Sequence, residues 1–318
     1  MRKSVTPADL ARSVVAVPPL ARSADGAFDM AANKALIEHM EQGGVDTLLY
    51  GGNALAQHWP ISKTAEWLDA LESLVAEDTW LMPSVGCDGG KLVDQAEILA
   101  GRGYPVALLL PMVPPRTDAG SAEALRRFHG ETGTQLMAYI KTDGYMPAAD
   151  LEQLAAEGVL FGVKYAVPRT DGARDAYLDA IISAIGAERI ISGFGEPPAL
   201  AHMLDYGLAG FTAGCVCLAP RISMRILHAL QAGDRQAAEA ALQAMLPLEA
   251  LRSEINEIRV LHEAIGLSGL AECGPVLALS SDLSEEERAR VAPVAQALLD
   301  AERALEHETA GTPLSSVT

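Results

Sequence analysis

The stretch VLFGVKYA, residues 159–166, is a short apolar run that contains one lysine. Its length and its content of β-branched and aromatic residues predict a buried β-strand. Side chains alternate along a strand, so Lys164 shares one face with Gly162 and Ala166, while the bulky side chains take the other face. Gly162 and Ala166 are small enough to leave room for the lysine side chain and for a bound substrate. A charged lysine is destabilising in such a place unless its charge is lost or used. The stretch therefore predicts a strand and marks Lys164 as a candidate functional residue.

Eight apolar runs of this kind alternate with amphipathic segments up to residue 220. They cover residues 13–20, 45–52, 79–86, 105–111, 135–142, 159–166, 189–195 and 208–220. The segments between them, such as residues 62–78, have apolar residues at helical spacing. Apolar strands that each lead into a helix indicate a parallel sheet covered by helices, and eight such units favour a closed (β/α)8 TIM barrel. An open doubly wound sheet is the alternative, but no G-x-G-x-x-G turn follows the first strand and no P-loop pattern occurs.

The chain after the last apolar run has helical patterns alone. We expect the barrel to cover residues 1–230 and a C-terminal helical region to cover residues 231–307. The polar residues 308–318 are expected to form a disordered tail. The predicted fold class is therefore α/β, a single (β/α)8 barrel with a C-terminal helical extension.

Composition restricts the class of partner. Of the 318 residues 49% are hydrophobic and 21% charged, which is enough to bury a large core. The formal net charge of −18 and the lack of a Lys/Arg cluster argue against binding to nucleic acid or to an anionic membrane. No secretory signal and no apolar run of about 20 residues occurs, so we expect a cytoplasmic protein with a small-molecule ligand.

The four cysteines are too few for a disulfide framework in a chain of this length. Cys215 and Cys217 share one face of an apolar segment, but two thiols without further ligands make an incomplete zinc site. We interpret them as small core residues, and we predict no metal site.

The sequence alone leaves two explanations for a lysine at position 164 in an apolar strand. In a desolvated site the ammonium form is disfavoured, so more free amine is present to attack a carbonyl and form an imine that acts as an electron sink. Alternatively, the lysine ends a strand, and its head reaches solvent or pairs with a carboxylate.

The order and spacing of several segments resemble those of one enzyme family. The segments are VPPL (17–20), DGAFD (25–29), GGNALAQH (51–58), GVKYA (162–166), SGFGEPPAL (192–200) and GFTAGCVCLAP (210–220). Together they resemble the dihydrodipicolinate synthase/N-acetylneuraminate lyase family of class I aldolases. The resemblance implies a (β/α)8 barrel with C-terminal helices and a Schiff-base lysine on the sixth strand, which Lys164 matches.

Tyr139 matches the tyrosine that this family carries on strand five. Such a phenol moves protons to and from the imine or the substrate when it lies within hydrogen-bond reach, and the alternative is a ring that only packs. Lys141 shares its strand face and is a rival amine. Because a polar loop follows Lys141, we expect it to be at most a substrate contact.

A glycine-rich turn follows the second strand. The backbone N–H groups of Gly51, Gly52, Asn53 and Ala54 are predicted to form a small nest for the carboxylate of a keto acid, and an ordinary glycine turn is the alternative. The wall of the pocket is expected to include Ser192, Gly193 and Cys215.

The chain also departs from the family pattern. Met112 and Val113 stand where dihydrodipicolinate synthases carry a tyrosine that reaches into a neighbouring subunit's site. Gly144 stands in place of an arginine, and Leu55 in place of a glutamate. The synthase reaction is therefore disfavoured.

These features predict a Schiff-base lyase or aldolase acting on a 2-keto acid, either of the pyruvate type or a 2-keto-3-deoxy acid. The mechanism requires neither metal nor other cofactor, and the resemblance implies a homo-oligomer, a dimer or a tetramer. A dehydratase that uses the same imine is one alternative, and a catalytically impaired ligand-binding barrel is another. A phosphate-binding isomerase is disfavoured because the glycine-rich phosphate turns expected after strands seven and eight are not evident.

Overall fold

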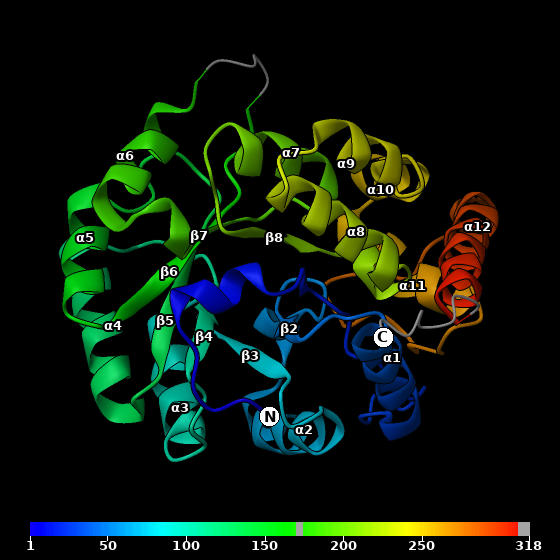
Figure 1. The fold of residues 1–318 in the computed structure, drawn as a ribbon. Helices are drawn as coiled ribbons and strands as arrows, with labels where there is room; N and C mark the ends of the chain where they lie inside the picture. The colour runs from blue at the N-terminus through cyan, green and yellow to red at the C-terminus, as the bar shows by residue number, and fades with distance from the viewer. Residues whose placement is uncertain (170–173, 311–318) are drawn as a thin grey trace, which may run out of the picture.

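The computed structural model describes residues 1–169 and 174–310, and in it eight parallel strands close into a barrel (Figure 1). The strands are β1 (Val15–Ala16), β2 (Thr47–Tyr50), β3 (Trp80–Val85), β4 (Val106–Leu109), β5 (Gln135–Ile140), β6 (Leu160–Tyr165), β7 (Ile190–Ser192) and β8 (Gly210–Ala213). Strand β1 pairs with both β2 and β8, which closes the barrel. The predicted (β/α)8 barrel is confirmed, and the open sheet is excluded.

One helix follows each strand and lies outside the barrel (Figure 1). These helices are α1 (Met30–Gln42), α2 (Ile61–Leu74), α3 (Gly89–Leu99), α4 (Asp118–Thr132), α5 (Ala148–Ala156), α6 (Ala176–Ile185), α7 (Glu196–Leu204) and α8 (Pro220–Gln231). Side-chain caps begin several of them. The Asp29 carboxylate accepts from the N–H of Ala32 at the start of α1, and the Thr117 hydroxyl accepts from the N–H of Gly120 at the start of α4.

The apolar run 208–220 forms a strand only in its first part. Strand β8 ends at Ala213, and Cys215–Cys217 form a short 3-10 helix before Pro220 opens α8. Cys215 and Cys217 therefore do not share a strand face as the sequence suggested. Both are fully buried free thiols, in agreement with the interpretation as core residues.

The C-terminal region is helical, as predicted. It contains α9 (Arg235–Leu242), α10 (Leu246–Glu254), α11 (Glu257–Leu267) and α12 (Glu285–Ala310). Helix α12 extends into the segment that was predicted as a disordered tail, and residues 311–318 lie outside the described part of the chain. No described helix is long and apolar enough to span a membrane.

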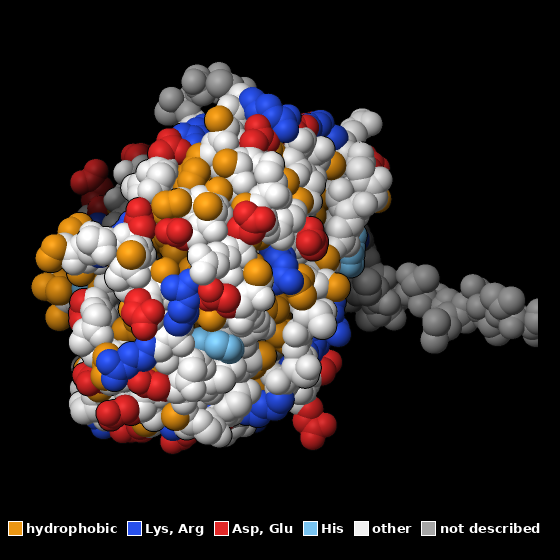
Figure 2. Space-filling view, turned by 90° about the vertical axis from the view of Figure 1, so that its left-hand side faces the viewer, with side chains coloured by type: hydrophobic (Ala, Val, Ile, Leu, Met, Phe, Trp, Pro, Cys, Tyr) orange, Lys and Arg blue, Asp and Glu red, His pale blue; other side chains and the backbone are white. Residues whose placement is uncertain are grey.

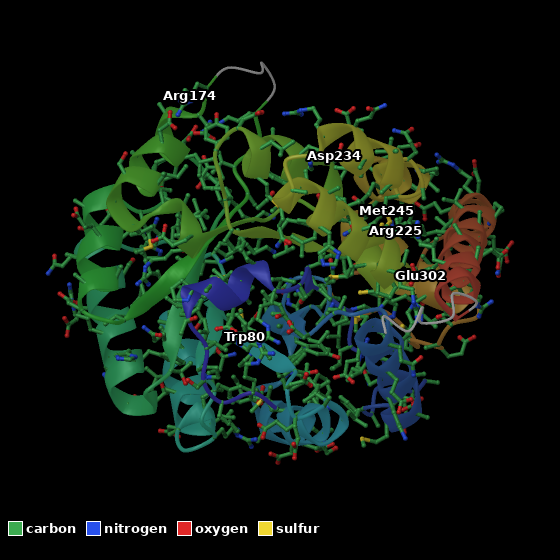
Figure 3. The ribbon with its side chains drawn as sticks, viewed as in Figure 1. Trp80, Arg174, Arg225, Asp234, Met245 and Glu302 are labelled. Carbon is green, nitrogen blue, oxygen red and sulfur yellow. The ribbon has the colours of Figure 1, made fainter. Side chains whose placement is uncertain are left out.

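A buried carboxylate joins α12 to the barrel. Glu302 is 0% exposed and accepts hydrogen bonds from the backbone N–H groups of Arg221 (2.9 Å) and Ile222 (3.2 Å) in the first turn of α8. The Arg221 guanidinium also donates to Glu302 at 3.1 Å. Figure 3 labels Glu302 where the two helices meet. This contact fixes one end of the helical region against the barrel.

Acidic and basic side chains are mixed on the face of the molecule where α4, α5 and α6 lie (Figure 2). On α4, for example, Arg126 pairs with Glu157 and Arg127 pairs with Glu131. Basic groups on this face therefore have acidic partners, which agrees with the absence of a basic cluster in the sequence.

Candidate active site

A cavity of about 680 Å³ lies at the carboxyl ends of the barrel strands. Its wall includes the ends of β5, β6 and β8, residues that follow β2, β3, β4 and β7, and residues of α10 and α11. In (β/α)8 barrels the carboxyl end of the strands is where functional sites are built. The cavity contains both residues that were predicted to be catalytic, Lys164 and Tyr139.

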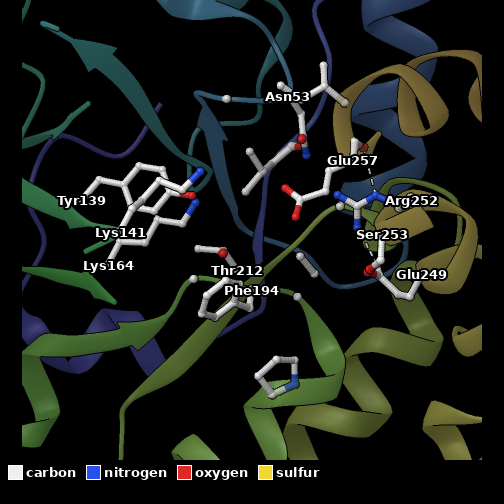
Figure 4. A pocket seen from close by; sticks show the side chains of 18 of the residues that line it. Asn53, Tyr139, Lys141, Lys164, Phe194, Thr212, Glu249, Arg252, Ser253 and Glu257 are labelled. Carbon is white, nitrogen blue, oxygen red and sulfur yellow. Dashed lines mark hydrogen bonds and ion pairs between the residues drawn. The ribbon is translucent and has the colours of Figure 1, made fainter. Parts of the chain in front are cut away.

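Lys164 projects from β6 into this cavity and is 4% exposed (Figure 4). Burial lowers the pKa of its amine to about 7, and repulsion from the neighbouring Lys141 acts in the same direction. Glu257 across the cavity opposes this shift in pKa. Near neutral pH a large fraction of the amine is therefore unprotonated and nucleophilic.

Gly193, and not Gly162 as predicted, leaves the space beside Lys164. Gly162 was predicted to leave space for the lysine, but a Cβ there would collide with the backbone carbonyl of Arg189. Gly162 therefore allows close approach of the neighbouring backbone. It is Gly193 that leaves space, because a Cβ on it would lie 3.1 Å from the Cγ of Lys164 and 2.8 Å from the Cβ of Ala166.

Tyr139 is the direct neighbour of Lys164 on the adjacent strand β5. The Lys164 Nζ lies 4.0 Å from the centroid of the Tyr139 ring, and the Nζ of Lys141 lies 5.6 Å from the same centroid. Burial, together with the nearby Glu257, raises the pKa of the Tyr139 phenol, which is therefore a neutral donor at physiological pH. Among the described residues no hydrogen bond joins this hydroxyl to either amine.

Part of the predicted carboxylate nest lines the cavity. Gly52 and Asn53 are in its wall, whereas Gly51 and Ala54 are not. The Asn53 side chain donates to the carbonyl of Val17 at 2.7 Å, which ties the turn to the end of β1. In the described part of the chain the backbone N–H groups of Gly52 and Asn53 have no acceptor. Two donors therefore remain available beside the cavity.

Of the three residues predicted to wall the pocket, only Gly193 lines the cavity. Ser192 is fully buried, and its hydroxyl is hydrogen-bonded to Nδ1 of His202 at 2.7 Å. Cys215 is also fully buried, 4.0 Å from the guanidinium of Arg252. Ser192 and Cys215 lie behind the wall and support it. The described residues contain no group of side chains suited to bind a metal ion.

The helical region contributes residues that the sequence did not reveal. Glu249 and Arg252 of α10, Ser253, and Glu257 at the start of α11 line the side of the cavity opposite Lys164 (Figure 4). No local pattern marks these residues, because their position depends on how α10 and α11 pack over the barrel. Gln57, Phe194 and Thr212 are further lining residues that were not predicted.

A buried ion pair forms part of this opposite side. The Arg252 guanidinium is paired with Glu249 three residues earlier, and its Nε donates to the backbone carbonyl of Glu257 at 3.1 Å. Behind the pair lies Glu196, which is 0% exposed and accepts from the Ser223 hydroxyl at 2.8 Å. Burial and the nearby Glu249 raise the pKa of Glu196 to about 7. The positive charge of Arg252 is thus already compensated by protein carboxylates.

The positions that depart from the family pattern, Leu55, Met112, Val113 and Gly144, are not among the residues that line this cavity. Gly144 has a positive φ of 64° and does not line the cavity. The nearby Arg169 is held by ion pairs to Asp143 and Asp175. Met112 donates its backbone N–H to the Tyr145 hydroxyl at 2.8 Å.

Comparison with known proteins gives matches in structure only. No protein-family model and no curated protein matches the sequence. A dihydrodipicolinate synthase from Agrobacterium tumefaciens str. C58 matches with a TM-score of 0.80 and 21% identity, over 92% of this chain and 99% of that chain. The synthase from Bacillus clausii has a TM-score of 0.78 and 21% identity, over 91% and 98% of the two chains.

A third solved structure carries a ligand. It is a prophage protein of the dihydrodipicolinic acid synthase family from E. coli K12, in complex with pyruvate, with a TM-score of 0.73 and 20% identity over 90% of this chain and 98% of that one. At such identities the likeness establishes the fold. The chain therefore has the fold of the dihydrodipicolinate synthase structures, as the sequence resemblance predicted.

Proposed function

We propose that this protein is a Schiff-base lyase that acts on a 2-keto acid, with Lys164 as the nucleophile. The observation that carries the proposal is the buried amine of Lys164, whose pKa is lowered to about 7, inside a 680 Å³ cavity at the carboxyl end of the barrel. An amine in this state is suited to attack a ketone. The pyruvate complex of a protein with the same fold supports a keto acid as the ligand.

The chemistry follows from the positions of the side chains. The amine of Lys164 adds to the keto carbon, and loss of water gives an imine. The N–H groups of Gly52 and Asn53 hold the substrate carboxylate, because they are donors without a partner in the described chain. Tyr139 donates its proton to the hydroxyl that leaves as water, and the resulting phenolate accepts the proton of the C4 hydroxyl. The C3–C4 bond then breaks, and its electron pair moves into the imine to give an enamine and a free aldehyde. Protonation of the enamine and hydrolysis of the imine then release pyruvate and the lysine.

Tyr139 is the candidate proton carrier. Its ring contacts Lys164, and its neutral phenol is a donor at physiological pH. In the unliganded site its hydroxyl makes no hydrogen bond to the amine, so the transfer requires the substrate or a small movement of the ring. Hydrogen bonds of catalytic groups commonly form only once the substrate is bound.

We further propose that the substrate is a longer 2-keto-3-deoxy acid, which is cleaved or dehydrated, and that dihydrodipicolinate is not the product. Gly144 supplies no cation where the synthases carry an arginine, and Arg169 nearby is paired with two carboxylates. Lys141 is the one candidate cation left near Tyr139 in the described part of the site. Cleavage releases pyruvate and an aldehyde, whereas dehydration keeps the carbon chain intact, so product analysis separates the two reactions.

The test is reductive trapping. The protein is incubated with pyruvate or a longer 2-keto acid, reduced with borohydride, digested and analysed by mass spectrometry. We expect the added mass on the peptide that contains Lys164, and no added mass in Lys164→Ala. Lys141→Ala is the matched control, and it should still be labelled at Lys164. Labelling of Lys141 alone, or of no lysine, would overturn the proposal.

A further inference from the structure

We propose that Glu257 and Ser253 bind the hydroxyl groups in the tail of the substrate and so select a hydroxylated 2-keto acid over one with a second carboxylate. This inference rests on the proposed function, because it assumes that the keto end of the substrate is held at Lys164. It assigns the specificity of the reaction to the C-terminal helices α10 and α11. The barrel strands supply the chemistry.

The position of Glu257 is well defined. It is the first residue of α11, whose N-terminus is capped by the Asn256 side chain through the N–H groups of Ile258 (3.1 Å) and Arg259 (3.0 Å). Arg252 holds the backbone carbonyl of Glu257 at 3.1 Å. The backbone of Glu257 is therefore fixed on both sides. Figure 4 shows its carboxylate directed into the cavity, toward the side where Lys164 and Tyr139 lie.

The carboxylate of Glu257 is available to a ligand. Within the described chain it has no hydrogen bond and no ion pair, although its neighbours are engaged. Glu249 is paired with Arg252, and Glu254 is paired with Arg290. Glu257 is solvent-exposed at the cavity, so its carboxylate can lack a protein partner at little cost in stability. As a carboxylate it only accepts hydrogen bonds, and it therefore binds groups that donate them.

The other groups near Glu257 favour hydroxyls over a second charge. Ser253 lines the same cavity, and a serine hydroxyl both donates and accepts. A second substrate carboxylate would meet Glu257, and the guanidinium of Arg252 is already paired with Glu249. An ammonium group would be repelled by Lys141 in the same cavity. A neutral tail with several hydroxyls can satisfy Glu257 and Ser253 without meeting a like charge.

The size of the cavity agrees with a longer substrate. At about 680 Å³ it lies in the range of sites that enclose drug-sized ligands, which have many more atoms than pyruvate. Lys164 and Glu257 are on opposite sides of it (Figure 4). A substrate with its keto carbon at Lys164 therefore extends its tail toward α10 and α11.

Three six-carbon 2-keto acids test the inference by competition. The first is 2-keto-3-deoxygluconate, which has hydroxyls on its tail. The second is 2-ketohexanoate, whose tail is an unsubstituted alkyl chain and which is called the plain acid below. The third is 2-ketoadipate, which has a second carboxylate. Each is titrated against isotope-labelled pyruvate, and the concentration that halves the label trapped on Lys164 at short times is measured. Label from pyruvate is distinguished by mass from any pyruvate released by cleavage, so the readout does not depend on which reaction follows imine formation. The assay is run well above pH 7, where the amine is free in every variant.

In the wild type, 2-keto-3-deoxygluconate should compete best and 2-ketoadipate worst. Glu257→Ala should weaken competition by 2-keto-3-deoxygluconate about 10- to 100-fold, the usual effect of losing a hydrogen bond to a charged group. It should change competition by 2-ketohexanoate less than about threefold, and it should strengthen competition by 2-ketoadipate. Ser253→Ala should have a smaller effect, about 2- to 10-fold, on the hydroxylated acid alone.

Glu254→Ala is the matched control. Glu254 is close in sequence but paired with Arg290 outside the cavity, and its loss should not change the order of the three acids. If Glu257→Ala weakens the hydroxylated and the plain acid equally, or if the wild type does not distinguish them, the inference is wrong while the Schiff-base proposal stands. If pyruvate leaves no mass on Lys164 of the wild type, the proposed function fails and the inference fails with it.

Discussion

The Lys164 amine lies over the face of the Tyr139 ring, 4.0 Å from its centroid. The two residues are in register with each other on the neighbouring strands β5 and β6. Two opposing effects act on the proton of this amine. Burial and Lys141 lower its pKa to about 7, whereas the electron-rich ring face favours the ammonium form. The ring face and Glu257 both oppose the loss of this charge. An amine with a pKa near neutrality is well suited to exchange protons during imine formation and hydrolysis.

This balance predicts the pH dependence of imine formation. Only the unprotonated amine attacks, so the rate of trapping should rise with pH through about 7 and reach a plateau above it. Lys141→Met removes a repelling charge and should move the midpoint to higher pH, while Glu257→Gln removes an attracting charge and should move it to lower pH. The measurement is the initial rate of pyruvate trapping between about pH 5 and pH 9.5. Midpoints that do not move in opposite directions would contradict this account.

The same pKa makes Lys164 a source of instability. Its folded pKa of about 7 lies below the ordinary value of 10.5, so between these pH values the unfolded chain binds more protons at this site and stability rises with pH. The cost in folding free energy of burying the ammonium form is fully present below about pH 7. Lys164→Met should therefore abolish trapping and yet raise the Tm by a few degrees at pH 7 and below. This gain over the wild type should shrink as the pH rises toward 10.5, which parallel thermal melts would detect.

Tyr139→Phe separates the ring from the hydroxyl. The ring face over Lys164 remains, so the adduct should still form with an unchanged pH midpoint. Loss of the proton carrier should slow turnover of the 2-keto acid by about 10² to 10⁴. Tyr139→Leu is the companion variant. Without an aromatic face the ammonium form loses its contact, so the trapping midpoint should move to lower pH. Wild-type turnover in Tyr139→Phe would show that the tyrosine is only structural.

The barrel could be predicted from the sequence because its signals are local. Each strand is a compact apolar run, and each helix that follows carries its own spacing of apolar residues. Lys164 was found in the same way, as a charge inside such a run. The role of Gly162 was misjudged because the close approach of the Arg189 backbone depends on the stagger of β6 against β7, and alternation along one strand does not specify that stagger.

The far side of the cavity could not be predicted for a related reason. Glu249, Arg252 and Glu257 are charged residues on helices that look like ordinary solvated helices in the sequence. They reach the cavity only because α10 and α11 pack over the carboxyl end of the barrel. Gly214 was a weak local signal, since a Cβ there would collide with the Arg252 guanidinium. The sequence does not reveal that Arg252 is the residue that lies against Gly214.

The contact of Glu302 with the first turn of α8 should be important for stability. Glu302→Ala would leave the N–H groups of Arg221 and Ile222 without their acceptor in a buried place, and we expect a loss of about 2–4 kcal/mol in the free energy of unfolding. Glu302→Gln keeps an acceptor oxygen and should lose about half as much. The control is Asp300→Ala on the exposed face of α12, which should change stability by less than about 0.5 kcal/mol. Denaturant unfolding measures all three variants.

The final prediction concerns dihydrodipicolinate synthesis, which we expect to be poor. In that reaction a semialdehyde with its own carboxylate meets the enamine formed on Lys164. Here Gly144 offers that carboxylate no cation, and Glu257 repels it from the far side of the cavity. A missing hydrogen bond to a charged group is worth about 1.5–3 kcal/mol, or about 10- to 150-fold in rate if it is felt in the transition state.

Lys141 decides how strongly this prediction holds. It directly follows strand β5, which carries Tyr139, and it lines the cavity with its amine 5.6 Å from the centroid of the Tyr139 ring. A coupled assay with pyruvate and aspartate semialdehyde gives the answer. We expect kcat/KM to stay below about 10⁴ M⁻¹s⁻¹, the lower end for enzymes acting on their own substrates. A higher value would refute the prediction. Lys141→Ala would then show the reason: if the activity falls with that variant while trapping of pyruvate on Lys164 persists, Lys141 takes the place of the missing arginine and receives the semialdehyde carboxylate.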